Sequence, residues 1–242
     1  MIYGTNSLEC THEASGTTIR FDAFGALQGW LDEQAPPLEV ASAQEWKESH
    51  DLTGKLVVAY DWTYTTKYEG DLLLNPKMLR SGGVDICQVS ETASSDAHCQ
   101  QATQPALWEV TEESIDRAAL MRQEPILYFD EVNLYESELD DNGISRVNVK
   151  VRVMASSWYV LMRYWLRADG TLTRIRDTRI YCPFHATSKA MCDSSHVIRE
   201  VTHREGNFED LDPKRAVEAR LNPDVGQQFL PITFQKVEKL RI

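Results

Sequence analysis

The chain has 242 residues, which is enough to bury a sizeable core in one large domain or in two small ones. Hydrophobic residues make up 42% of it and charged residues 26%, and this composition excludes a disordered or fibrous chain. The formal net charge of -12 opposes nonspecific nucleic-acid binding, and no apolar run approaches the roughly 20 residues that span a bilayer, so we expect neither a nucleic acid nor a membrane as partner.

The cysteines and the first residues indicate where the chain resides. Five cysteines, an odd number spread from Cys10 to Cys192, do not form the dense framework of a small secreted domain. Residues 1–16 lack the basic and apolar regions of a secretory signal. We therefore expect reduced thiols and a cytoplasmic location, with the nucleus as a second compartment.

The N-terminal part of the chain predicts four short elements. A strand is predicted at 19–21, and apolar residues at spacings of three and four predict a helix over 23–32. Ser42 begins a capping box, which predicts a helix over 42–49. The β-branched and apolar run at 56–60 predicts a strand.

A long polar stretch interrupts the regular elements. Residues 71–104 contain paired glycines and little periodicity, which predicts an excursion loop. We therefore expect one domain over 1–242 with a flexible insertion at 75–105. Thr111 can cap a helix after this insertion, and the apolar spacing predicts that helix over 111–123.

The clearest turn signal lies in the middle of the chain. Asn142-Gly143 is the dipeptide that most readily forms a type I′ turn, so 126–141 and 144–154 are predicted to form a hairpin. A two-residue turn at this position also predicts the register of the two strands. The apolar pairs expected on one face are Leu134 with Val151 and Val132 with Val153.

The register of the next two predicted strands depends on the length of the loop between them. Residues 158–166 are apolar apart from Arg163, which predicts a central strand covered on both faces. Asp169-Gly170 turns the chain into a strand over 171–181. A two-residue loop would place Arg163 opposite Arg176, and a three-residue loop with a bulge would avoid this pairing; the sequence leaves both open.

The C-terminal region predicts a helix and a strand. Asp212-Pro213 has an N-cap residue followed by proline at the first helical position, which predicts a helix to about residue 221. A strand is predicted over 229–240. Hairpins with a few short helices indicate an α+β fold that is mainly antiparallel β, with two packed sheets and the helices at the periphery.

Two groups of residues could support an enzyme. Four soft ligands in the spacing C-x2-H-x6-C-x3-H could hold a structural zinc ion. These ligands are Cys182, His185, Cys192 and His196. An acidic set on the predicted hairpin, Asp130, Glu131, Glu136, Glu138, Asp140 and Asp141, could act in hydrolysis, although a solvated hairpin tip explains it better. A zinc-containing or acid–base hydrolase is therefore the alternative function.

Other catalytic signals are missing from the sequence. No nucleophile elbow, phosphate-binding loop or dinucleotide motif is present, so we expect no enzymatic activity and no cofactor. Arginines and aromatic residues are instead concentrated on the strands predicted at 158–166 and 171–181. Guanidinium groups bind carboxylates and stack on aromatic rings, so this composition fits a surface that recognises another protein. The alternative is that each arginine occupies the wet face of its strand and pairs with Asp177 or with the acidic hairpin. The arginines concerned are Arg163, Arg167, Arg174, Arg176 and Arg179.

Several long motifs resemble those of the Tip-forty-one-like family. They are Tyr60-Asp61-Trp62-Thr63-Tyr64-Thr65-Thr66, Val149-Lys150-Val151-Arg152-Val153-Met154-Ala155-Ser156-Ser157, Leu166-Arg167-Ala168-Asp169-Gly170, Asp177-Thr178-Arg179, Ile198-Arg199-Glu200 and Phe229-Leu230-Pro231-Ile232. The resemblance covers about 19–75 and 106–242.

The resemblance implies a noncatalytic regulator in TOR signalling. Members bind catalytic subunits of type 2A-family serine/threonine phosphatases, including the C-terminal tail, and restrain their activity; Tap-forty-two is a further partner in fungi. The implied phosphatase contacts in this chain are Ile115, Ile175 and Asp177, followed by Arg179, Arg199 and Glu200. Replacing Asp177 by Asn is expected to weaken binding without altering folding.

Overall fold

The computed structural model describes most of the chain outside the predicted insertion. The described residues are 2–13, 15–28, 38–39, 57–58, 66–73, 108–137, 143–168, 172–184, 194–207, 210–212, 214, 217–218 and 222–242. The helix predicted over 42–49, most of the strand at 56–60 and the insertion at 75–105 lie outside these residues, as does most of the helix predicted from Pro213 to about residue 221. No helix in the described part is long and apolar enough to cross a bilayer.

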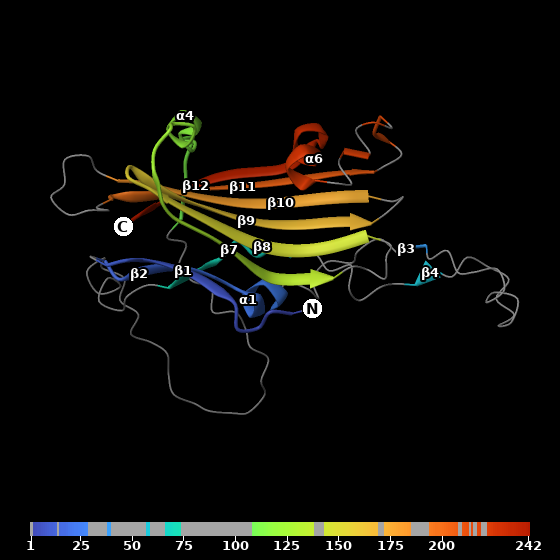
Figure 1. Cartoon of the computed structure of the whole chain (residues 1–242), viewed down its shortest axis with the longest axis horizontal. Helices are drawn as coiled ribbons and strands as arrows, with labels where there is room; N and C mark the ends of the chain where they lie inside the picture. The colour runs from blue at the N-terminus through green and yellow to red at the C-terminus, as the bar shows by residue number, and fades with distance from the viewer. Residues whose placement is uncertain are drawn as a thin grey trace, which may run out of the picture.

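A large antiparallel sheet organises the molecule (Figure 1). It has seven strands, and each pairs with its neighbours in the antiparallel direction. In spatial order these are β6 (Glu109–Val110), β12 (Ile232–Arg241), β11 (His196–Asn207), β10 (Leu172–Pro183), β9 (Ser157–Ala168), β8 (Gly143–Met154) and β7 (Ile126–Ser137).

A smaller sheet of three strands packs on one face of the large one (Figure 1). Its strands are β1 (Ser7–His12), β2 (Thr17–Asp22) and β5 (Asp71–Leu73), with β2 in the middle. The helix α1 (Ala23–Gln28) follows β2, and a separate two-stranded pair is formed by β3 (Leu38–Glu39) and β4 (Val57–Val58).

The main core lies between the two sheets. Phe21 and Leu8 from the small sheet belong to the same buried cluster as Val149, Met162 and Ile180 from the large one. We call this side of the large sheet the inner face. Burial of apolar surface is the main favourable contribution to folding. The arrangement of two sheets around one shared core, with short helices outside it, confirms the predicted fold.

The opposite side of the large sheet, the outer face, carries two further helices (Figure 1). The helix α4 (Arg117–Leu120) covers one end of this face, together with the buried side chain of Ile115. The helix α6 (Pro223–Phe229) covers the other end, and the Leu230 side chain that follows it packs on Trp165 and Ile175. Successive residues of a strand point to opposite faces, so every strand contributes to both sides.

The hairpin between β7 and β8 was predicted correctly, but its register was wrong. Val132 pairs with Val149 and Glu131 with Lys150, so the register is displaced by four residues from the prediction. Because the displacement is an even number, the apolar residues still occupy the inner face. The two strands also shift register near Ile126 and again near Asn133, which a two-residue turn could not reveal.

The loop between β9 and β10 has the longer of the two lengths considered. Ala168 pairs with Leu172, which leaves three residues between the strands and places Arg163 opposite Asp177. Opposite charges in a cross-strand pair stabilise a sheet, whereas the alternative would have opposed two arginines. Gly143 faces Ala168 across β8 and β9 with a φ of 147°. A Cβ atom there would lie 1.8 Å from the carbonyl oxygen of Arg167, so only glycine fits.

Several helix boundaries differ from the predictions. The helix predicted over 111–123 is a single turn, because Asp116 and not Thr111 caps it: the Asp116 carboxylate accepts from the Ala119 backbone N–H at 2.9 Å. The helix over 23–32 is described only as α1, and 71–73 form β5 instead of a loop. Asp212 accepts from the Lys214 backbone N–H at 2.8 Å, as the predicted cap requires.

Candidate functional site

A buried ion-pair network attaches α6 to the outer face. Arg163 on β9 donates to both carboxylate oxygens of Asp177 on β10, at 2.6 and 2.7 Å. The same guanidinium donates to Asp224 and, at 3.0 Å, to Gln227, and both of these residues lie on α6. Arg179 also donates to Asp177 and to Gln227, the latter at 3.1 Å. Two strands and one helix are therefore joined through a single network.

The electrostatic balance of this network maintains the charge of Arg163. Burial alone lowers the pKa of Arg163, but the hydrogen bonds and negative charges of Asp177 and Asp224 outweigh this effect and leave the pKa above its ordinary value. Arg163 and Asp177 are both almost fully buried, at 6% and 2% exposed. A bidentate pair of this kind is directional, so it positions α6 as well as neutralising the charge.

A second polar contact attaches the segment around α4. The Glu200 carboxylate on β11 accepts from the Ile115 backbone N–H at 2.7 Å and from the Arg117 guanidinium. The Ile115 side chain is buried against Tyr181 and Ile198 of the sheet. Glu200 is 3% exposed, so its carboxylate is held in the sheet and the α4 segment is attached to it. We call residues 111–121 the α4 segment.

Between the two covers lies a row of partly exposed side chains on the outer face. The register places Lys150, Leu161, Arg179, Glu200 and Val237 side by side across β8, β9, β10, β11 and β12. All of them except Glu200 are partly exposed. We call this row the central strip. It presents two cationic and two aliphatic side chains, and one of these, Val237, also packs against the apolar cluster under the α4 segment. This composition is suited to contact with another protein.

Five of the six residues assigned by resemblance lie on this outer face. They are Ile115, Ile175, Asp177, Arg179 and Glu200, and the strand register brings them together along the α4 segment, the central strip and the α6 end. Arg199 lies on the inner face, where it donates to Glu238 at 2.6 Å and stacks 4.1 Å above the Trp108 ring centre. Arg199 is therefore not part of the same surface.

Most of these residues are covered in the structure. Ile115, Ile175, Asp177 and Glu200 are each at most 3% exposed, so they shape the surface from below. Arg179 is the most accessible of the five, with 13% of its side chain exposed. The burial of Asp177 also changes the expectation for Asp177→Asn, because loss of its charge leaves the buried Arg163 guanidinium without its bidentate partner.

The predicted band of arginines and aromatic residues is divided between the two faces. Arg163 and Arg179 lie on the outer face, whereas Arg174 and Arg176 lie on the inner face. Arg174 donates to Glu205 at 2.5 Å, and Arg176 donates to the Thr66 carbonyl at 2.8 Å. These arginines therefore do not form a single surface, since successive residues of a strand point to opposite faces.

Two of the four proposed zinc ligands are described, and these two do not converge. Cys182 is buried in the core on the inner face, whereas His196 lies on the outer face and contacts Glu113 at 3.4 Å. His185 and Cys192 lie outside the described residues. Within the part of the chain that the structure describes, no group of three or more His, Cys, Asp or Glu side chains could hold a metal ion. Two of the four ligands thus point away from each other.

The acidic hairpin residues are engaged in ordinary contacts. Glu136 pairs with Arg146, and Glu131 lies 3.3 Å from the Lys150 ammonium group. Asp130 accepts from the Tyr128 hydroxyl at 2.9 Å. Glu138, Asp140 and Asp141 lie outside the described residues. Cross-strand pairs of this kind stabilise the hairpin and do not form a pair of carboxylates around a substrate.

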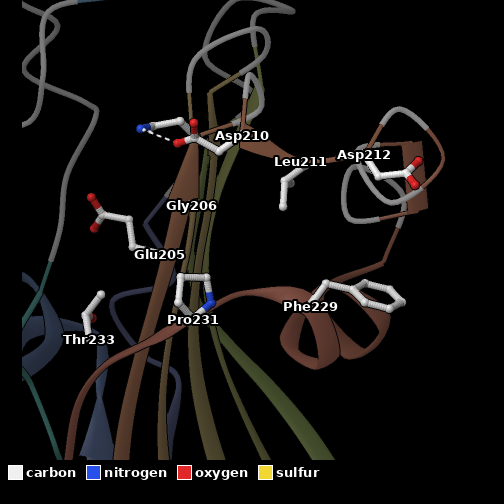
Figure 2. A pocket seen from close by; sticks show the side chains of 9 residues that line it. Glu205, Gly206, Asp210, Leu211, Asp212, Phe229, Pro231 and Thr233 are labelled. Atoms are coloured by element: carbon white, nitrogen blue, oxygen red, sulfur yellow. Dashed lines mark hydrogen bonds between the residues drawn. The ribbon is translucent and has the colours of Figure 1, made fainter.

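A pocket of about 440 Å³ lies beside α6, at the end of β11 (Figure 2). Its polar residues already have partners: Asp210 accepts from Asn207 at 3.2 Å, and Glu205 accepts from Arg174. Its apolar lining is formed by Leu211, Phe229 and Pro231. Figure 2 shows Phe229 on the helix and Asp210 beyond the end of the strand that carries Glu205. Its lining carries three carboxylates and the Thr233 hydroxyl, and it contains no histidine, cysteine or lysine.

Two residues of the network, Asp224 and Gln227, were not predicted from the sequence. Both lie on α6, which was not predicted. The signal for this helix was present: Asn222 accepts from the Asp224 backbone N–H at 2.8 Å as an N-cap, and Pro223 takes the first helical position. Its role as a cover of the outer face depends on tertiary packing and has no local signal.

Comparisons with known proteins identify the family. The TIP41-like family matches residues 1–212. A TIP41-like protein of Arabidopsis thaliana is 39% identical over 100% of this chain and 78% of its own length, and a TIP41-like protein of Homo sapiens is 35% identical over 99% of this chain and 75% of its own. The type 2A phosphatase activator TIP41 of Saccharomyces cerevisiae is 29% identical over 92% of this chain and 57% of its own. The chain therefore belongs to the TIP41-like family.

Proposed function

We propose that this chain is a noncatalytic regulator that binds the catalytic subunit of a type 2A-family protein phosphatase. The name of the Saccharomyces cerevisiae relative supports a role in phosphatase regulation. The observation that carries the proposal is the gathering of Ile115, Ile175, Asp177, Arg179 and Glu200 on the outer face, between the α4 segment and α6. The central strip is the contact surface in this proposal.

The buried members of this group act by positioning. Glu200 holds the α4 segment and Asp177 holds α6, so both determine how wide the central strip is and which side chains border it. Arg179 reaches the surface and is the residue proposed to bind the carboxylate of the phosphatase tail, since a guanidinium binds a carboxylate through paired hydrogen bonds. Arg199, on the inner face, is proposed to support the fold of β11 only.

The proposal includes restraint of phosphatase activity in TOR signalling, with Tap-forty-two as a further partner. Occlusion of the catalytic subunit by the central strip would lower its activity, and a regulator can shift the subunit's conformation only by its differential affinity for the two states. The yeast relative is named an activator. An assay of the catalytic subunit on a phosphopeptide, with increasing amounts of this chain, measures the sign of the effect.

A calorimetric titration of the purified catalytic subunit tests the contact surface. Leu161→Glu places a charge in the central strip at a partly exposed position, and we expect binding to weaken by about tenfold or more, as for truncation of an interface anchor. Phe24→Glu, at an exposed position of α1, is the matched control and should bind as the unmodified chain does. Equal affinities for the two variants would contradict the proposal.

The tail contact is tested with two forms of the catalytic subunit. The full subunit should bind the unmodified chain more tightly than a subunit that lacks its last residues. With Arg179→Gln this difference should disappear, because the guanidinium that binds the tail carboxylate is gone. If both subunit forms bind the unmodified chain equally, Arg179 has no such role.

A further inference from the structure

The edge strand β7 is only half covered. On the side away from β8, Ile2 forms an antiparallel bridge with Tyr135, and the Tyr3 backbone N–H donates to the Leu134 carbonyl at 3.1 Å. The Asn6 side chain donates to the Asn133 carbonyl at 2.8 Å. Within the described residues, no segment pairs with 126–132 on this edge. One half of the edge has an antiparallel partner, and the other half, which we call the open half, has none among the described residues.

The open half is apolar and exposed. Its residues Ile126, Leu127, Tyr128 and Phe129 are 56%, 57%, 53% and 59% exposed. Edge strands normally carry charges, prolines or a cover that prevents pairing with other chains. Asp130 and Glu131 follow the run and a register shift lies between Ile126 and Tyr128, but the four apolar side chains themselves remain exposed. A run of exposed apolar residues of this length marks a site of interaction. Figure 1 shows β7 at the boundary of the large sheet.

Charge indicates which kind of partner fits. Asp130 follows the apolar run and accepts from the Tyr128 hydroxyl and from the Glu131 backbone N–H, but no cation pairs with it among the described residues. A residue opposite Asp130 on an added strand would have its side chain on the same face, where a Lys or Arg would be favoured. A second copy of this chain is disfavoured because each copy carries a net charge of -12.

We propose that residues 126–130 bind an extended segment of another protein, which adds to the large sheet as an antiparallel strand beside β7. Backbone hydrogen bonds to the open edge supply affinity, and apolar side chains at alternate positions of the segment pack on the exposed run. A Lys or Arg of the segment pairs with Asp130. This site lies on the sheet edge, so it does not depend on phosphatase binding through the central strip.

A selection of random peptides tests this site. Phage-displayed random decapeptides are selected on the immobilised chain, and a Leu127→Lys/Phe129→Lys double variant is used for counter-selection. We expect the selected peptides to carry apolar residues at alternate positions together with a Lys or Arg. Their affinity for the double variant should be at least about tenfold lower than for the unmodified chain. Peptides that bind both chains equally would overturn the proposal.

Two further variants control the test. Val110→Lys changes an 84% exposed residue of β6, at the opposite edge of the same sheet, and should leave peptide binding unchanged. Asp130→Lys should weaken binding of a selected basic peptide by about threefold to fivefold and strengthen binding of the same peptide with Glu in place of its Lys or Arg. No change of preference would overturn the proposed pairing.

Two measurements on the unmodified chain complete the test. Amide hydrogen exchange with the selected peptide should show new protection at 126–132, and protection confined to other strands would overturn the proposal. Sedimentation velocity should show no concentration-dependent dimer. A dimer that the double variant abolishes would mean that a second copy occupies the edge instead. Because the double variant changes exposed residues, its circular dichroism and melting midpoint should match the unmodified chain.

Discussion

The two faces of the large sheet are covered in different ways. The inner face meets the small sheet through one continuous apolar cluster that includes Phe21, Val149 and Ile180. The outer face has two smaller apolar clusters, one under the α4 segment and one beside α6, and each cover is also attached by buried charged groups. Apolar burial is non-directional and large, whereas a buried ion pair is directional and offsets its own desolvation only with good geometry.

The two faces therefore contribute differently to the molecule. Because the inner face supplies most of the buried apolar surface, it determines whether the chain folds. The outer-face covers can each be loosened separately, because each has its own cluster and its own polar contact. The surface that we propose for the phosphatase thus lies where position depends on a few named residues and not on the main core.

The largest effect is expected from Phe21→Ala. Phe21 is fully buried between the sheets and packs edge-to-face with Tyr68 at 6.4 Å, so its truncation should lower the free energy of unfolding by about 3–5 kcal/mol. Chemical denaturation measures this. Phe24→Ala, three residues along the chain and 63% exposed, is the control and should cost about 0.5 kcal/mol or less. Similar losses for both would show that the inner face is not the main source of stability.

The next effect is expected from Asp177→Asn. Loss of the Asp177 charge leaves the buried Arg163 with Asp224 as its remaining charged partner. The free energy of unfolding should fall by about 3 kcal/mol, at the low end of the range for a broken buried pair. Amide hydrogen exchange should accelerate first in 223–229. Asp224→Asn changes a side chain that is 62% exposed and should cost clearly less. Exchange that accelerates equally in the inner-face strands would contradict independent loosening of α6.

A smaller effect is expected from Glu200→Gln. The amide oxygen can still accept from the Ile115 backbone N–H, but the charge that faces Arg117 is lost, so the cost should be about 1 kcal/mol. Faster amide exchange confined to 115–121 is the expected signature. If α6 loosens as well, the two covers are coupled and the comparison between them has to be revised.

The last effect appears only at alkaline pH and concerns the inner side. Burial, with a smaller contribution from Cys182, raises the pKa of the Cys10 thiol to about 12 from an ordinary value of 9.0. Above pH 9 the unfolded chain releases this proton and the folded chain retains it, so stability falls as pH rises from 9 towards 12. Thermal melting at pH 8 to 11 should show a less steep loss for Cys10→Ala. An identical loss in the two chains would mean that Cys10 does not hold its proton.

Local patterns in the sequence predicted much of the sheet. Asn142-Gly143 located the hairpin, and alternating apolar residues gave the correct inner face of β7 and β8. The same signal could not give the register, because register depends on the two shifts near Ile126 and Asn133. Cysteine and histidine spacing suggested a zinc site, but Cys182 and His196 lie on different strands whose pairing sends their side chains to opposite faces.

The candidate site shows the same limit. Charge alone left the partner of Arg163 undecided, and only the three-residue loop after Ala168 placed it opposite Asp177. The recognition band of arginines and aromatic residues combined residues of both faces. The two-residue period separates Arg174 and Arg176 from Arg179, but which face is the outer one depends on how the sheets pack. The α4 segment was expected to be a longer helix, but Glu200 from a distant strand holds its backbone in another conformation.

By itself, the sequence determined the family, the antiparallel β character and the apolar face of the central hairpin, because these follow from motifs and from the two-residue period of a strand. Only the tertiary structure decided which strands are neighbours and how Arg163 binds Asp224 on α6. It also decided which half of β7 has no partner among the described residues. These features depend on contacts between residues far apart in the chain, and such contacts form only when apolar burial brings the strands together.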